Sequence, residues 1–270
     1  VMSMVPIGAA VTDGYNAGHG LPFDSEGMKE RYPGIFFSQF TGAELVADKW
    51  NLSREDLDKF AMESHQKAAH ATESKYFDKE ILPVEGKNAE GINDLVMADE
   101  GIRFDASLDK LAGLKPVTEG GVITAGNASQ ITDGAAAVVI CNDAGLKKIQ
   151  SNPRAEIVSI SVVGDDPVFM LTGPIPASKK ALETANLSID DMDLYEVNEA
   201  FAPVPLAWAD DLKADKSKLN VNGGAMALGH PLGATGAKLM TTLLHEMERR
   251  ESTYGLQAIC EGGGTANATI

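Results

Sequence analysis

The stretch Asn220-Val-Asn-Gly-Gly-Ala-Met-Ala-Leu-Gly-His-Pro-Leu-Gly-Ala-Thr-Gly236 places one histidine, His230, among five glycines. These glycines allow the backbone to approach a ligand closely. Pro231 suits the first turn of a helix, and the positive end of that helix would disfavour protonation of His230. A neutral imidazole there can serve as base and hydrogen-bond donor. A glycine turn around a structural histidine and a phosphate-binding loop are the alternatives, although the spacing fits neither common nucleotide fingerprint.

Strands and helices alternate on both sides of this stretch. The expected strands are 155–163, 194–197, 256–260 and 265–270, and the expected helices are 176–185, 201–212 and 231–249. Such alternation predicts an α/β layer in which helices pack on a sheet. Open sheets of this class bind ligands at the ends of their strands, so motifs at strand ends are the candidates for function.

The first half of the sequence is less regular. Residues 1–40 are rich in glycine and proline and predict loops rather than a regular element. Amphipathic helices are expected at 41–50 and from Ser53, a suitable N-cap, to about Phe77. The polar stretch 82–118 is typical of a covering subdomain of loops and short strands.

The middle of the chain contains a small-to-branched apolar run. Residues 134–140 predict a buried strand, or the strand–helix junction before it. Cys141, directly after this run, is most simply a core residue. Pro153 marks a boundary between the irregular and the alternating parts of the chain.

Composition and charge exclude several classes of protein. The 270 residues are 44% hydrophobic and 23% charged, which is typical of a folded globular protein. The net charge of -16, without a cluster of Lys and Arg, argues against a nucleic-acid partner. No apolar run is long enough to cross a bilayer, so a membrane partner is not expected either.

The cysteines and histidines give two further expectations. Cys141 and Cys260 are far apart in a sequence without a secretory leader, which favours a reducing compartment, taken as the cytoplasm, over a disulfide framework. His65 and His70 do not share a helix face, and no Cys or His pair has zinc spacing. No metal site is therefore expected.

Two more motifs stand at strand ends. Asn198-Glu-Ala-Phe-Ala202 follows a strand, and an amide there can orient a ligand, although a helix cap is the simpler interpretation. Cys260-Glu-Gly-Gly-Gly264 ends another strand, and its glycines leave backbone N–H groups free to point at one oxygen beside a thiol. A single buried cysteine is usually inert, yet three successive glycines are hard to explain by packing alone.

Together, the Asn198-Glu-Ala-Phe-Ala, Gly229-His230-Pro-Leu-Gly and Cys260-x-Gly-Gly-Gly motifs resemble the C-terminal half of thiolases in both order and spacing. The resemblance extends over the whole chain. Met2-Ser-Met-Val-Pro6 is similar to the segment shortly after the nucleophile of that family, and the stretch 124–134 to its passage out of the lid.

This resemblance implies a layered αβαβα fold, of the α/β class, with two similar halves and an inserted lid. It assigns 1–7 to a remnant of the N-terminal half, 8–120 to the lid, 121–152 to the end of the N-terminal half, and 153–270 to the C-terminal half. The first half is thus incomplete, and the cysteine that becomes acylated is expected to be absent. The chain as written is expected to fold poorly and to be inactive.

The resemblance also implies roles for individual residues. His230 would activate the acylated cysteine, and Asn198 would hold a water that donates with His230 to one oxyanion, while the N–H of Gly262 serves a second. Cys260 would be the acid–base residue. Coenzyme A contacts are expected from three residues: Arg103, Ser129 and Phe201. Coenzyme A and acyl-CoA would be substrates, no separate cofactor is implied, and relatives suggest a homodimer or homotetramer.

Departures from the family pattern leave the substrate class and the activity open to interpretation. Ser38-Gln39 replaces the His-Met pair of short-chain biosynthetic members, which favours degradative 3-ketoacyl-CoA thiolysis of longer or bulkier acyl chains. Glu261 is an acidic choice beside Gly262. The alternatives are a non-catalytic CoA-binding or scaffold subunit and a hydrolase with Cys260 as nucleophile. The pairing of the asparagine and cysteine motifs argues against β-ketoacyl synthases, which are related in fold.

Overall fold

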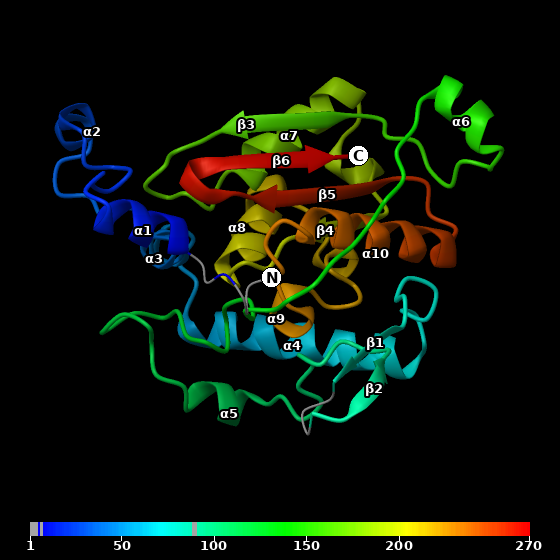
Figure 1. The fold of residues 1–270 in the computed structure, drawn as a ribbon, viewed down its shortest axis with the longest axis horizontal. Helices are drawn as coiled ribbons and strands as arrows, with labels where there is room; N and C mark the ends of the chain where they lie inside the picture. Colours follow the sequence, from blue (N-terminus) through cyan, green and yellow to red (C-terminus); the bar gives the residue numbers. More distant parts are fainter. Residues whose placement is uncertain (1–4, 6–7, 88–90) are drawn as a thin grey trace.

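A computed structural model describes residue 5 and residues 8–87 and 91–270 of the chain (Figure 1). Most of the segment 1–7, including nearly all of the Met2–Pro6 motif, therefore lies outside the described residues. The largest sheet has four strands in the order β3-β6-β5-β4. Their bounds are Ile160–Gly164 for β3, Leu194–Val197 for β4, Gly255–Cys260 for β5 and Thr265–Thr269 for β6. β4 and β5 are parallel, whereas β6 runs antiparallel to both of its neighbours.

Helices cover both faces of this sheet. On one face lie α7 (Pro174–Ala185) and α8 (Pro203–Leu212) (Figure 1). They enclose a core in which Tyr195 contacts the fully buried Trp208 edge-on. On the other face, α10 (Thr235–Arg250) packs against β4 and β5. Side chains alternate across a strand, so the two faces of β4 have different neighbours. The predicted α/β layer is confirmed.

The predicted lid lies along the edge of this layer (Figure 1). It contains α3 (Gln39–Lys49), α4 (Arg54–Glu73), α5 (Leu108–Ala112) and a hairpin of β1 (Val84–Lys87) and β2 (Asn93–Val96). The N-terminus of α4 is fixed by a capping box, in which the side chains of Ser53 and Asp56 each accept a backbone N–H of the other. The predicted N-cap is confirmed. α4 packs against α9 (Ala225–Leu228), so the region predicted to be a lid contacts the segment that leads to His230.

The prediction that the first forty residues contain no regular element was wrong. They include α1 (Ala9–Asn16) and α2 (Glu26–Arg31), although most of the other described residues in this segment are turns and loops. Gly8 and Gly18 have φ of 83° and stand just outside the ends of α1, so these glycines bound a helix rather than prevent one. Ser25 caps α2 by accepting the N–H of Met28.

The apolar run 134–140 is not a buried strand, and that prediction was also wrong. Val139 is 84% exposed and Ile140 65% exposed, and no strand in the described part of the chain pairs with this run. Cys141 is exposed too, and α6 (Asp143–Ile149) follows it, capped by Asn142. An apolar run needs a partner strand to become part of a sheet, and the sequence pattern gives no information about that partner.

Several element ends differ from their predicted positions. α7 and α8 both begin at a proline, which suits the first turn of a helix. β3 begins at Ile160, five residues later than expected, because only there does the ladder with β6 start. Three short 3₁₀ turns complete the fold, at Ile189–Asp191, Lys216–Lys218 and Gly262–Gly264. No helix of the described residues is both long enough and apolar enough to cross a membrane.

Candidate active site

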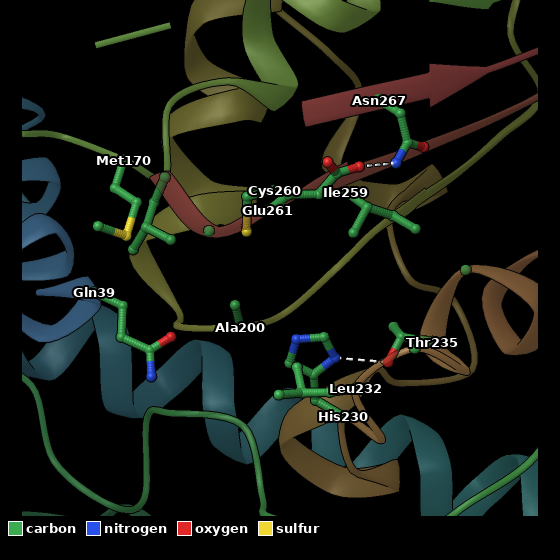
Figure 2. A pocket seen from close by; sticks show the side chains of 14 residues that line it. Gln39, Met170, Ala200, His230, Leu232, Thr235, Ile259, Cys260, Glu261 and Asn267 are labelled. Atoms are coloured by element: carbon green, nitrogen blue, oxygen red, sulfur yellow. Dashed lines mark hydrogen bonds between the residues drawn. The ribbon is translucent and has the colours of Figure 1, made fainter. Parts of the chain in front are cut away.

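A cavity of about 350 Å³ lies where the ends of β4 and β5 meet the loop before α10. His230, Cys260 and Gly262 line it together with Ala200, which follows Asn198 by two residues. Figure 2 shows the sulfur of Cys260 and the ring of His230 on opposite walls of this cavity. The three motifs found in the sequence therefore converge on one place, at the carboxyl ends of two parallel strands, as expected for this class of fold.

The ring of His230 is held at both nitrogens. Its Nε2 lies 3.4 Å from Nδ2 of Asn198, and its Nδ1 lies 2.6 Å from Oγ1 of Thr235. An amide nitrogen can only donate, so Nε2 is the acceptor and Nδ1 carries the hydrogen. Thr235 fits this assignment, because its hydroxyl can donate to the carbonyl of Pro231 at 3.0 Å while accepting from Nδ1. The basic nitrogen of His230 thus faces Asn198 and the cavity.

His230 is kept neutral by its surroundings. Burial lowers the pKa of its imidazole, because a charged ring would lose solvation. The direction agrees with the sequence prediction, but the cause differs. α10 begins only at Thr235, and residues 231–234 form a turn, so the ring is not at the first turn of a helix beginning at Pro231. The backbone N–H of His230 donates to the carbonyl of Gln130, which fixes the turn from the other side.

Asn198 occupies the first position after β4 and is fully buried. Its backbone N–H still continues the ladder by donating to the carbonyl of Ala258. Among the described residues, its Oδ1 has no hydrogen-bond partner. A buried orphan acceptor is rare in folded proteins, and it favours a functional role for Asn198 over the simpler role of a helix cap.

Cys260 ends β5 and is followed by the turn Gly262–Gly264. Burial, together with the charge of Glu261, raises the pKa of the Cys260 thiol to about 12. Such a thiol holds its proton firmly, which disfavours the alternative of a hydrolase with Cys260 as nucleophile.

The glycines after Cys260 serve different purposes. A Cβ at Gly264, whose φ is 85°, would lie 3.0 Å from the carbonyl oxygen of Asp165, so packing and backbone both require glycine there. A Cβ at Gly262 would meet no atom of the described chain within 4 Å. Packing does not require glycine at 262, and the open space beside its backbone is consistent with a bound group.

Two buried carboxyl groups, Glu196 and Glu199, stand on either side of Asn198 in the sequence. Glu199 accepts hydrogen bonds from Asn220, Ser64 and the backbone N–H of Met226, at 2.9, 2.7 and 3.1 Å. Oε2 of Glu196, by contrast, has no hydrogen-bond partner among the residues described. Burial raises the pKa of both carboxyls, and the charge of Glu199 raises that of Glu196 further, whereas hydrogen bonds offset the shift at Glu199. Glu196 is therefore the better proton holder of the two.

Glu196 has a neighbour that can use such a proton. Gln257 lies opposite it in the parallel register of β4 and β5, and its Oε1, like Oδ1 of Asn198, is a buried acceptor without a partner among the described residues. A protonated Glu196 can donate to that oxygen and so satisfy two orphan atoms at once.

Replacing Glu196 by Gln is expected to stabilise the protein at neutral and alkaline pH. The folded-state pKa of Glu196 is raised above its unfolded value. The favourable contribution of this carboxyl to the free energy of unfolding is therefore complete below the unfolded pKa and is lost as pH rises toward the folded pKa. Each unit between the two values costs about 1.4 kcal/mol. Urea unfolding from pH 4 to 9 measures this, and the two curves should converge near pH 4.

Glu199→Gln is the matched control, three residues along the same segment. Both carboxylate oxygens of Glu199 accept hydrogen bonds, whereas glutamine has only one oxygen. At least one of the donors from Asn220, Ser64 and Met226 would therefore face an amide nitrogen, which cannot accept its hydrogen bond. This variant should be less stable than the parent near pH 4, and it should gain less stability than Glu196→Gln as the pH rises. A lower stability of Glu196→Gln at pH 8 would contradict the assignment of the proton to Glu196.

The residues expected to contact coenzyme A lie elsewhere. Arg103, Ser129 and Phe201 are not among the described residues that line the cavity. The side chain of Arg103 is exposed, while its backbone N–H donates to Nδ1 of His65. Ser129 donates its backbone N–H to Ala200, and the buried Phe201 contacts the ring of Phe40 edge-on. Their contacts with coenzyme A stay predictions.

Sequence reasoning missed much of the lining. Of the fourteen residues that line the cavity, it selected only three as site residues, and the eleven others include Gln39, Met170, Leu171, Thr235 and Asn267. Met170 has a φ of 58°, and the N–H of Leu171 lies 2.5 Å from the carbonyl oxygen of Phe169, so this loop is tightly bent where it meets the cavity. No local signal marks such residues, except that Thr235 stands at the start of the helix that follows His230.

Comparison with known proteins supports the same family over nearly the whole chain. Residues 11–144 match the model of the thiolase N-terminal domain, and residues 151–270 match that of the thiolase C-terminal domain. The chain is 51% identical to the steroid 3-ketoacyl-CoA thiolase FadA6 of Mycobacterium tuberculosis, covering all of this chain and 65% of that protein. It is 45% identical to the acetyl-CoA acetyltransferase of Shinella zoogloeoides, covering 97% of this chain and 67% of that one.

Solved structures agree. The human mitochondrial 3-ketoacyl-CoA thiolase in complex with CoA aligns with a TM-score of 0.78 and 44% identity, over 85% of this chain and 57% of that one. The predicted thiolase fold is thus confirmed, and the chain spans about two thirds of the length of the relatives it matches. On the agreement of both domain models, these relatives and the three converging motifs, the chain belongs to the thiolase family.

Proposed function

We propose that these residues form the base and acid–base part of a degradative thiolase, which cleaves a 3-ketoacyl-CoA to acetyl-CoA and a shortened acyl-CoA. The observation that carries this proposal is the geometry of His230. Its unprotonated Nε2 and the Cys260 thiol face each other across one cavity, next to an amide and an open glycine backbone. A base, an acid and hydrogen-bond donors are the groups that acyl transfer requires.

The acyl-accepting thiol is proposed to come from residues other than these 270. Cys260 is held in its thiol form, and Cys141 is exposed and does not line the cavity of the described chain. His230 would take the proton of that third thiol, whose sulfur then attacks the 3-keto carbon. Asn198, through a bound water, and the N–H of Gly262 would stabilise the negative oxygens that form.

Cys260 would move the remaining protons. Cleavage of the bond between the α- and β-carbons leaves the acyl group as a thioester on the enzyme, and the acetyl-CoA carbanion takes its proton from Cys260. The incoming coenzyme A then returns a proton to Cys260 as its sulfur attacks the acyl thioester. Shortened acyl-CoA leaves, and the displaced enzyme sulfur regains its proton from His230.

The lining of the cavity favours a longer or bulkier acyl group. Met170, Leu171, Leu232 and Ile259 are apolar, and a flexible methionine adapts to irregular apolar shapes. Gln39 also lines the cavity. It belongs to the Ser38-Gln39 pair, which stands where short-chain biosynthetic thiolases tend to carry a His-Met pair. The name of the Mycobacterium relative, a steroid 3-ketoacyl-CoA thiolase, supports a bulky alicyclic substrate.

Binding and assembly are part of the same proposal. Arg103, Ser129 and Phe201 are proposed to contact coenzyme A, which is a substrate, and no separate cofactor is invoked. The protein is proposed to act as a homodimer or homotetramer in the cytoplasm, without nucleic-acid or membrane partners. Light scattering of the purified protein would measure its oligomeric state.

The test is a thiolysis assay with the protein purified from its native host. Loss of 3-ketoacyl-CoA is followed with acetoacetyl-CoA, a long-chain 3-ketoacyl-CoA and a bulky alicyclic one. We expect turnover with all, and kcat/KM at least tenfold higher for the larger substrates. Binding of coenzyme A without turnover of any substrate would instead support a non-catalytic binding or scaffold subunit.

A further inference from the structure

Glu261 lies in the site, although the reaction described above gives it no role. It follows Cys260 directly, and it is among the residues that line the same cavity as His230 and Cys260. Figure 2 shows its carboxylate turned toward Asn267 of β6. The residue is exposed, so it has no packing role in the core that would explain an acidic side chain at this position, next to the thiol proposed to transfer protons.

The carboxylate of Glu261 is held at both oxygens by the next strand. Its Oε1 accepts a hydrogen bond from Nδ2 of Asn267 at 2.6 Å, and its Oε2 accepts one from Oγ1 of Thr265 at 3.1 Å. The backbone N–H of Glu261 donates to the carbonyl of Thr265 at 2.8 Å. We call these three contacts the Glu261 clasp. It closes the loop that contains Gly262, Gly263 and Gly264.

A loop of three glycines needs such a closure. Gly263 and Gly264 have φ of 78° and 85°, and glycine loses more conformational freedom on ordering than any other residue. The other end of the loop is fixed by the N–H of Asp165, which donates to the carbonyl of Gly264 at 2.7 Å. The clasp and this bond together hold Gly262 in one place beside the cavity.

We propose that Glu261 is a positioning residue, which through its clasp on Thr265 and Asn267 fixes the glycine loop and holds a negative charge on the residue that follows Cys260. This inference rests on the proposed role of Cys260 as the proton carrier. The fixed charge disfavours the thiolate form of Cys260, so Cys260 transfers protons and does not itself become acylated. The acyl group is then carried only by the other thiol of the proposed reaction.

The charges around Cys260 are consistent with this role. The charge of Glu261 adds to burial in raising the pKa of the thiol. The other titratable groups that face the loop are His230 across the cavity, which burial keeps neutral, and Asp165 and Asp166 on the segment packed against Gly264. No Lys or Arg of the described residues lines the cavity. Glu261 is therefore not neutralised by a cation there.

The experiment measures alkylation of Cys260 by iodoacetamide between pH 7 and 10, resolved by peptide mass spectrometry. Only a thiolate reacts, so the rate reports how readily the proton leaves. Glu261→Gln keeps the size of the side chain and an acceptor for Asn267 but removes the charge. We expect its Cys260 to react about three- to tenfold faster at pH 8.5. Exposed Cys141, in the same chain, is the internal reference and should react at an unchanged rate.

Asn267→Ala is the matched variant, because it removes one bond of the clasp but keeps the charge. Its alkylation rate at pH 8.5 should stay within twofold of the parent, while amide hydrogen exchange at Gly262 and Gly263 becomes at least fivefold faster. Equal alkylation rates in the parent and Glu261→Gln would overturn the role of the charge. Equally faster alkylation in both variants would overturn it too, because a loosened loop would then explain the change.

These outcomes are independent of the proposed function. Alkylation and hydrogen exchange need neither a substrate nor turnover. If the thiolysis assay fails while Glu261→Gln still accelerates alkylation, the clasp stands and the reaction is wrong. If thiolysis succeeds and alkylation is unchanged, the reaction stands and Glu261 has no electrostatic role.

Discussion

Replacing His230 by alanine is expected to lower kcat/KM for thiolysis by about 10²- to 10⁴-fold, the usual contribution of a positioned general base. The ring presents an unprotonated Nε2 to the cavity, and no other imidazole lines it in the part of the chain that is described. Steady-state kinetics with a 3-ketoacyl-CoA measure the loss. The variant should also fail to form the acylated enzyme, as read by intact mass after a short exposure to substrate.

Thr235→Val is the control for this prediction. It removes the acceptor at 2.6 Å from Nδ1 that selects the tautomer of His230, but it leaves the imidazole in place. Its activity should fall by about tenfold and no more, with an altered pH profile. Parent-like activity of His230→Ala would show that this ring is not the base.

Replacing Cys260 by alanine is expected to lower turnover by about 10²- to 10⁴-fold as well, because a proton carrier of the reaction is then missing. A more specific sign is exchange at the α-carbon. The parent should incorporate deuterium from D₂O into the methyl group of acetyl-CoA, whereas Cys260→Ala should incorporate at least a hundredfold less. Mass spectrometry of the recovered acetyl-CoA measures both.

The other cysteine of the chain, Cys141, provides the control variant for this prediction. Cys141→Ala alters an exposed thiol that does not line the cavity of the described residues, so turnover should stay within twofold of the parent. Deuterium incorporation that survives in Cys260→Ala, or that is lost in Cys141→Ala, would reverse the assignment of the proton carrier.

The sequence predicts the site residues at the ends of regular elements better than it predicts the other residues that line the cavity. Asn198, His230 and Cys260 were found because each follows or precedes a regular element, and parallel strands bring such positions together. Thr235 and Asn267 were missed because their roles depend on a helix start displaced by a turn and on a hairpin register. Neither has a signature in local sequence.

The errors in the first half have a different cause. Residues 134–140 have the composition of a buried strand, but burial depends on a partner that no local pattern specifies. The glycines and prolines around α1 and α2 predict loops, whereas in the structure several of them only end or separate short helices. The capped helix α4 was recognised because its start signal is contained within four residues.

The carboxylate of Glu199 has a consequence for protein engineering. It receives the hydroxyl of Ser64 from α4 on one side and the backbone of Met226 from α9 on the other. The covering helix and the segment that carries the histidine thus share a single anchor. A chimera that grafts the covering region of another protein onto this scaffold must bring a hydroxyl to position 64, because without it the buried carboxylate loses one of its three hydrogen-bond donors.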